Sequence, residues 1–148
     1  LMTRTSLHSE IVTTRLAEEP LLLVTPAVVE DCSWQTLEKL GFIAHPDSAH
    51  HAELLLGANY PQYRSAASLP QTGFSNQIGL ILEPVSRGLG ATVLPAHAVA
   101  AFPNQHAIRI HQLDVPVSET IYLAEPHLKP RPARVDMLVT HIKRWLKH

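Results

Sequence analysis

The short apolar run at residues 21–25 is the feature that most constrains the fold. It reads Leu-Leu-Leu-Val-Thr, contains no charge, and is followed by Pro26. Successive side chains of a strand point to opposite faces of a sheet, so an uninterrupted apolar strand requires that both faces be covered. The run therefore predicts a sheet between two layers of helices, which is the α/β class.

The segments that follow alternate between helical and extended patterns. Ser33 is a good N-cap, Trp34, Leu37 and Leu40 have helical spacing, and Gly41 is a natural helix stop. Further strands are expected at residues 42–44, 65–69, 91–94, 107–110 and 120–124, and further helices at 49–59, 73–87, 95–101 and 134–145. This alternation predicts a mostly parallel sheet with helices on both faces.

Composition excludes several classes of protein. The 148 residues carry 12 basic and 13 acidic side chains, so the formal net charge of -1 argues against a globally basic nucleic-acid binder. The uncharged apolar runs are much shorter than the ~18 residues that a membrane span needs, so no membrane association is expected. The single cysteine, Cys32, cannot form an internal disulfide.

Motifs for catalysis and metal binding are weak. His45, His50 and His51 lie close together in the sequence, but adjacent helical residues diverge, and no HExxH pattern strengthens a metal site. Ser75 and Ser86 do not lie in a GxSxG elbow. We therefore expect no catalytic residues, no metal ligands and no cofactor.

The predicted topology singles out the loops in which a ligand would bind. Ligands of open α/β sheets bind at the carboxyl ends of the strands, beside helix N-termini. In this chain that rule selects residues 45–48, 72–77 and 94–97.

A longer pattern resembles the LysR-type transcriptional regulators of bacteria. Residues 76–102 carry a helix ending in V-x-x-G-x-G and a strand ending in Leu-Pro, a pattern matched by Val85, Gly88, Gly90, Leu94 and Pro95. Upstream, the family's L-x-x-E-x-L-x-L-V-x-P form is matched by Leu16, Glu19, Leu21, Leu23, Val24 and Pro26. Downstream, residues 121–124 and the last helix are similar to the family's return strand and closing helix.

The resemblance implies the C-terminal part of an effector-binding (substrate-binding) domain. Such domains resemble type 2 periplasmic binding proteins, with two Rossmann-like α/β subdomains and a ligand cleft between them. On this basis residues 1–19 form a crossover from the first subdomain, residues 20–116 the second subdomain, and residues 117–148 the return strand and last helix. The two-subdomain domain would be incomplete in this chain.

The resemblance also implies which residues contact the effector. They are His45, Pro46, Asp47 and Ser48 after one strand, with Phe74, Ser75 and Asn76 as a second loop. Free N–H groups at a helix start favour a carboxylate effector, although the charge of Asp47 would oppose one. Simple N-capping by Asp47, Ser48 or Ser75 is the competing interpretation.

The function implied is effector sensing in a cytoplasmic regulator that self-associates as a homodimer or homotetramer. It would bind promoter DNA through a winged helix-turn-helix that has no counterpart in these residues. Two alternatives remain open: a fragment of a solute-binding protein, which shares the fold, and a small α/β enzyme using His45 or His51 as general base. The enzyme is the less favoured, because no nucleophile or orienting partner lies at a recognisable spacing.

Overall fold

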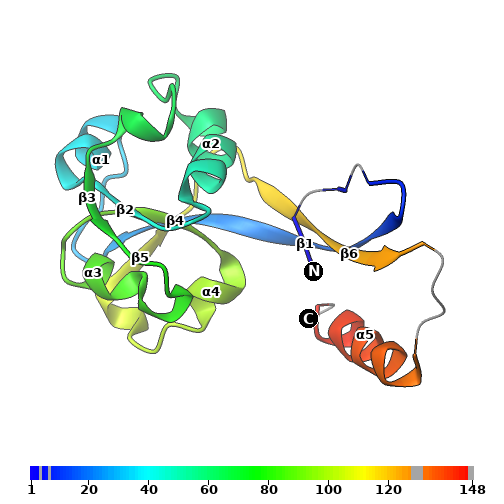
Figure 1. Ribbon diagram of the computed structural model, residues 1–148. Coiled ribbons are helices and arrows are strands. Elements are labelled where there is room, and N and C mark those ends of the chain that lie inside the picture. Colours follow the sequence, from blue (N-terminus) through cyan, green and yellow to red (C-terminus); the bar gives the residue numbers. More distant parts are fainter. Residues whose placement is uncertain (4, 7, 128–131, 147–148) are drawn as a thin grey trace. The chain divides into compact units, whose positions relative to one another are not determined.

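The computed structural model describes residues 1–3, 5–6, 8–127 and 132–146 (Figure 1). The chain divides into two compact units. The central unit is Pro20–Val117, and the terminal unit combines Leu1–Glu19 with Ser118–His148. Strand β1 (Ile11–Pro26) contributes residues to both units. Within the described ranges, no helix is both long enough and apolar enough to cross a membrane.

The terminal unit consists of paired strands and one helix. The first part of β1 pairs with β6 (Ser118–Pro126), and an antiparallel bridge joins Met2 to Tyr122. The Thr120 hydroxyl donates to the Glu18 carboxylate at 2.6 Å. Helix α5 (Ala133–Trp145) follows. The predicted strand at 120–124 and the predicted helix at 134–145 correspond to β6 and α5.

The sheet of the central unit is mixed, with both antiparallel and parallel pairs of strands. The second part of β1 pairs antiparallel with β4 (Thr92–Pro95) and with β5 (Ile108–His111). β2 (Phe42–Ala44) pairs parallel with β3 (Gln71–Phe74), and a parallel bridge between Phe42 and Ala91 connects β2 to the start of β4. The four short strands therefore run in one direction and β1 runs against them, which confirms the predicted α/β class.

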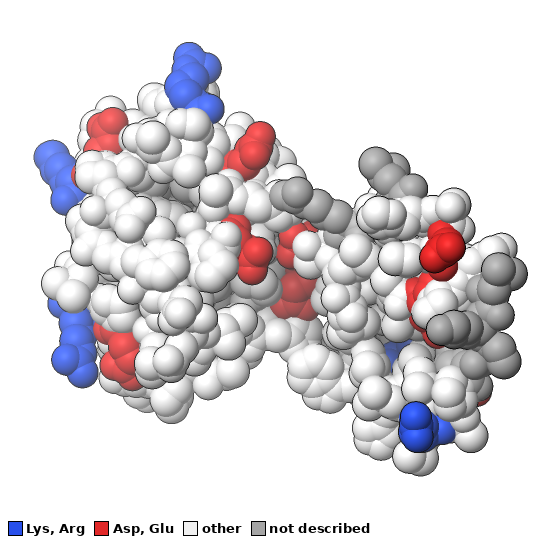
Figure 2. All heavy atoms as spheres, in the orientation of Figure 1, with Lys and Arg blue, Asp and Glu red and all other residues white. Residues whose placement is uncertain are grey.

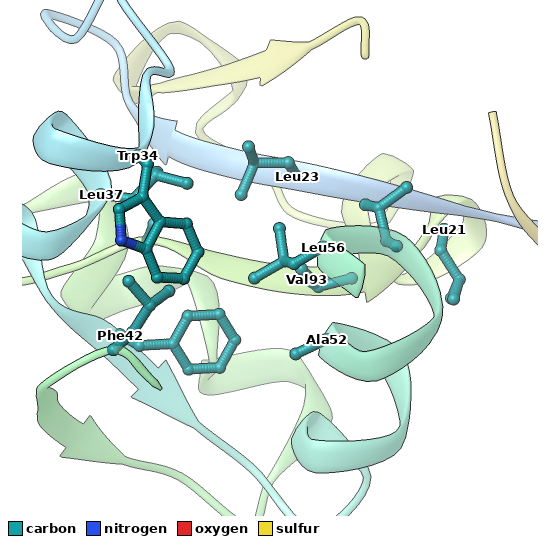
Figure 3. Close-up of a cluster of buried hydrophobic side chains, with 11 residues drawn as sticks. Leu21, Leu23, Trp34, Leu37, Phe42, Ala52, Leu56 and Val93 are labelled. Atoms are coloured by element: carbon teal, nitrogen blue, oxygen red, sulfur yellow. The ribbon is translucent and has the colours of Figure 1, made fainter. Parts of the chain in front are cut away.

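Both faces of this sheet are buried, as the apolar run of β1 predicts. Leu21 and Leu23 belong to one core cluster, drawn in Figure 3, with Trp34 and Leu37 of α1 (Trp34–Leu40). The intervening Val24 points to the opposite face and joins a second cluster. That second cluster also receives residues of α3 (Leu82–Ser86), α4 (Ala96–Ala100) and β5, including Leu82, Val85, Val99 and Ile108.

Local capping signals place α1 where the sequence predicts it. The Ser33 hydroxyl accepts a hydrogen bond from the Thr36 N–H at 3.4 Å. Gly41, at φ 80°, donates its N–H to the Leu37 carbonyl at 2.9 Å. This left-handed conformation favours glycine. The helix predicted at 49–59 is α2 (Ser48–Asn59).

The strand predicted at residues 65–69 is wrong. The structure has a 3₁₀ turn, η1 (Ala66–Ser68), in this place. The Ser65 hydroxyl accepts from the Ala67 N–H at 3.3 Å, and the Ser68 hydroxyl accepts from the Ser65 N–H at 2.9 Å. These reciprocal side-chain bonds satisfy the backbone locally and compete with strand pairing.

The single long helix predicted at residues 73–87 is also wrong. The segment begins within strand β3, continues through the 3₁₀ turn η2 (Ile78–Leu80), and ends in the short helix α3. Because β3 pairs in parallel with β2, its backbone is extended and cannot be helical. Pro84 lies in the first turn of α3, where its missing N–H is tolerated. A final 3₁₀ turn, η3 (Gln105–Ala107), precedes β5.

Candidate functional site

The two loops predicted to contact an effector lie side by side. β2 and β3 are parallel neighbours, so their carboxyl ends reach the same edge of the sheet. The Ser75 N–H, just after β3, donates to the carbonyl of Ala44, the last residue of β2, at 3.0 Å. This hydrogen bond brings the loop after β3 against residues 45–48. We call the two loops together the effector edge: His45, Pro46, Asp47, Ser48, Phe74, Ser75 and Asn76.

His45 points inward from this edge. Its side chain is 5% exposed, and its Nε2 lies 3.0 Å from the Val93 carbonyl of β4. A carbonyl only accepts, so Nε2 carries the proton in this contact. Burial lowers the pKa of His45, and the nearby His51 lowers it further, while the bond to Val93 and the charge of Asp47 oppose the shift. A neutral His45 therefore anchors the loop to the sheet.

Helix α2 begins within the effector edge, at Ser48. Ser48 is buried, and its N–H donates to the His45 carbonyl at 3.0 Å. Asp47 is the N-cap residue but makes no side-chain capping bond, and both Asp47 and Pro46 are exposed. The first-turn N–H groups of this 12-residue helix provide partial positive charge beside the exposed Asp47 carboxylate.

The second loop exposes two of its three side chains, Phe74 and Asn76, to solvent. Phe74 is 61% exposed at the end of β3, and Asn76 is exposed as well. The Ser75 hydroxyl is used within the loop, since it accepts from the Gln77 N–H at 3.3 Å. Ser75 thus shapes the turn, while Phe74 and Asn76 are available for a ligand.

One positioning residue of this region was missed by the sequence interpretation. Thr92 is fully buried in β4, and its hydroxyl donates to the Ile43 carbonyl of β2 at 2.9 Å. This bond reinforces the connection between the strand that carries the loop and the centre of the sheet. A threonine within the apolar run 91–94 was the available signal.

Three histidines, His45, His50 and His51, lie near one another in the folded chain. The ring centroids of His45 and His51 lie 5.4 Å apart, and those of His50 and His51 lie 6.0 Å apart. Across the described part of the chain, no group of three or more His, Cys, Asp or Glu side chains could hold a metal ion.

The family model of the LysR substrate binding domain matches residues 1–147. The chain belongs to this family. LysR substrate-binding domains are regulatory parts of transcription factors, and the predicted type 2 periplasmic-binding-protein-like fold is confirmed by the match. No curated protein matches the chain.

Solved structures share the fold at low identity. Full-length OxyR C199D from Pseudomonas aeruginosa matches with a TM-score of 0.69 and 21% identity over 92% of this chain and 51% of that chain. The Synechocystis PCC6803 CcmR regulatory domain, in complex with 2-PG, matches at 0.74 and 13% identity over 99% and 72%. The effector domain of the P. aeruginosa transcriptional regulator AmpR matches at 0.65 and 16% identity over 95% and 66%. The LysR-family chain therefore spans about half the length of full-length OxyR.

Proposed function

We propose that this chain is part of the effector-sensing domain of a LysR-type regulator and that the effector edge binds a small carboxylate metabolite. The supporting observation is the 3.0 Å hydrogen bond from the Ser75 N–H to the Ala44 carbonyl, which places two loops from separate strands beside the start of α2. On this proposal the central unit is the second regulatory subdomain, and its effector edge is one wall of a ligand cleft.

The chemistry of the effector edge supports an anionic ligand with an apolar or planar part. The α2 N–H groups favour a carboxylate, Asn76 can donate and accept hydrogen bonds, and Phe74 offers an exposed ring. Asp47 weakens the attraction, so the ligand needs contacts beyond charge. The solved CcmR domain, which has the same fold, is in complex with 2-PG.

Binding to DNA is proposed for the whole regulator and not for these residues. Figure 2 shows the described Lys and Arg side chains as separate groups on the face that it draws, with acidic side chains among them. We propose that a winged helix-turn-helix outside this chain contacts the promoter, that the regulator is a cytoplasmic homodimer or homotetramer, and that effector binding changes the arrangement of its subdomains.

Two substitutions test the effector edge. We expect Asn76→Ala and Phe74→Ala each to weaken binding of the best ligand from a panel of small carboxylates by about tenfold or more, measured by calorimetric titration. Asn104→Ala is the matched control, because Asn104 is exposed and makes no side-chain capping bond before β5, at the amino end of the strands. Equal losses in all three variants, or no carboxylate binding, would contradict the proposal.

The gene upstream of the codon for Leu1 tests the regulator assignment separately. A winged helix-turn-helix followed by a linker helix supports it. A charged segment, an apolar stretch and a small-residue cleavage site would instead indicate an exported solute-binding protein.

A further inference from the structure

Residues 112–116 leave the sheet between two segments that both pair with β1. His111, at the end of β5, is paired with Leu23. The Leu21 N–H donates to the Val117 carbonyl at 2.9 Å. One residue of β1 separates these two positions, whereas residues 112–116 separate their partners. The surplus residues cannot follow the ladder, so their backbone groups need other hydrogen-bond partners. We call residues 112–116 the connector, because the chain passes through them from β5 toward β6.

One side chain of α2 pairs with the backbone of the connector. Asn59 is the last residue of α2, and its Nδ2 donates to the Val115 carbonyl at 2.9 Å. Its Oδ1 accepts from the Val115 N–H, also at 2.9 Å. Nδ2 donates in addition to the Leu55 carbonyl within the helix, at 2.9 Å. The Asn59 amide therefore binds the connector as a neighbouring strand would, and the bond to Leu55 fixes its orientation.

The connector buries little of its own surface. Gln112, Asp114, Val115 and Pro116 are exposed, and only Leu113 is half-buried against a core cluster. A segment with little buried apolar surface can open locally at a free energy below that of global unfolding. The hydrogen bonds from α2 are therefore a main restraint on the connector.

We propose that Asn59 is a latch that gives the connector two states. In the latched state the connector is bound to the C-terminal end of α2. In the released state both bonds to Val115 are broken, and the connector is a mobile link between β5 and β6. The latch therefore controls how firmly the central unit holds the chain that leads into β6. The inference does not depend on the proposed effector edge, although both are carried by α2.

Hydrogen exchange of the ¹⁵N-labelled 148-residue chain, followed by NMR, tests the latch without a ligand. Asn59→Ala removes the bonds to Val115, while alanine has the higher helix propensity and preserves α2. We expect the Val115 amide to exchange about tenfold faster or more. The Ile43 amide, which donates to the Ala91 carbonyl within the sheet, should not exchange faster. Asn104→Ala is the matched control, since the exposed Asn104 makes no side-chain capping bond before η3.

A second variant and the unsubstituted chain give independent measurements. Asn59→Asp keeps an acceptor for the Val115 N–H but has no donor for the Val115 carbonyl, so we expect a smaller acceleration in the same direction. In the unsubstituted chain at low urea, local release of the connector exposes little surface. Exchange of the Val115 amide should therefore be nearly independent of urea, while exchange of the Ile43 amide becomes faster.

Two results would overturn the proposal. Unchanged or slower exchange of the Val115 amide in a folded Asn59→Ala chain would mean that Asn59 does not hold the connector. If the Val115 and Ile43 amides of the unsubstituted chain exchange at the same rate and respond equally to urea, the connector opens only when the whole central unit unfolds. It would then have no released state of its own, whether or not the substituted chains fold.

Discussion

The central and terminal units bury their apolar side chains to very different extents. The central unit places one cluster on each face of its sheet, with Leu37, Ile43 and Val85 fully buried. In the terminal unit Met137 is 71% exposed and Leu138 is 58% exposed. A strand pair with one helix lacks a second layer, whereas a sheet between two helix layers completes its own core. The central unit is therefore the self-sufficient part of the chain.

Truncating one leucine in each unit should show this difference most strongly. We expect Leu37→Ala to lower the free energy of unfolding by about 2–5 kcal/mol, because it leaves a cavity in a closed core. Leu138→Ala should change it by no more than about 0.5 kcal/mol, because the side chain is already exposed. Urea unfolding of both variants measures the contrast, and similar losses would mean that the terminal unit has a core of comparable quality.

The exposed face of α5 should cause the chain to self-associate. Met137 and Leu138 are 71% and 58% exposed on this helix, and the half-buried Val135 lies beside them. Exposed apolar patches of this kind mark contact surfaces. We expect the double substitution Met137→Glu, Leu138→Glu to raise the dissociation constant of self-association about tenfold or more in analytical ultracentrifugation. Val28→Glu is the control, since Val28 is 86% exposed in the central unit. A clean monomer of the unsubstituted chain at all concentrations would contradict this expectation.

Acidification should destabilise the central unit through His45. Burial lowers the pKa of His45 in the folded chain, so the unfolded chain binds the proton first. The stabilisation is present above the unfolded value of about 6.5 and is lost as the pH falls through the lower folded value.

We expect His45→Gln to flatten the decline of unfolding free energy between about pH 7 and 5, by less than about 1.4 kcal/mol per pH unit. His111, whose pKa burial also lowers, contributes part of the same slope and remains in this variant. His141→Gln, on the exposed surface of α5, serves as the control in the terminal unit. An unchanged slope in His45→Gln would show that the buried ring does not titrate in this range.

Two tyrosines of the central unit should respond differently to loss of the hydroxyl. Tyr60→Phe removes a 2.7 Å hydrogen bond to the Cys32 carbonyl and should cost about 0.5–1.5 kcal/mol. Tyr63→Phe removes a hydroxyl with no partner among the described residues, so it should be neutral or slightly stabilising. Denaturant unfolding of both variants makes this measurement. A larger loss for Tyr63→Phe would reveal a partner that the structure does not show.

The sequence predictions were correct where a structural element depends on neighbouring residues, and they were wrong where it depends on a distant segment. Helix α1 was placed correctly because Ser33 and Gly41 satisfy its ends within a few residues. The segment at 73–87 was misassigned because its first residues pair with β2, some 30 positions earlier in the chain. Helical spacing of apolar residues contains no record of such a pairing, so the strand could not be found by periodicity.

The candidate site divides in the same way. The sequence pattern identified both loops of the effector edge as ligand-binding candidates, and their contact through Ser75 and Ala44 is visible only in the folded chain. The inward direction of His45 toward Val93 also depends on β4. Tyr63 carried no signal in its own segment, since its ring packs against Trp34, which lies far away in the sequence.

The sequence by itself determined the α/β class, the two-sided burial of residues 21–25 and the ends of the first helix. These depend on side-chain polarity and on hydrogen bonds between near neighbours, which a linear pattern records. Only the tertiary structure decided that β1 runs against the four short strands and that the His45 ring turns inward to the Val93 carbonyl. Strand direction and side-chain orientation depend on contacts between segments that are far apart in the sequence, and a local pattern does not record these contacts.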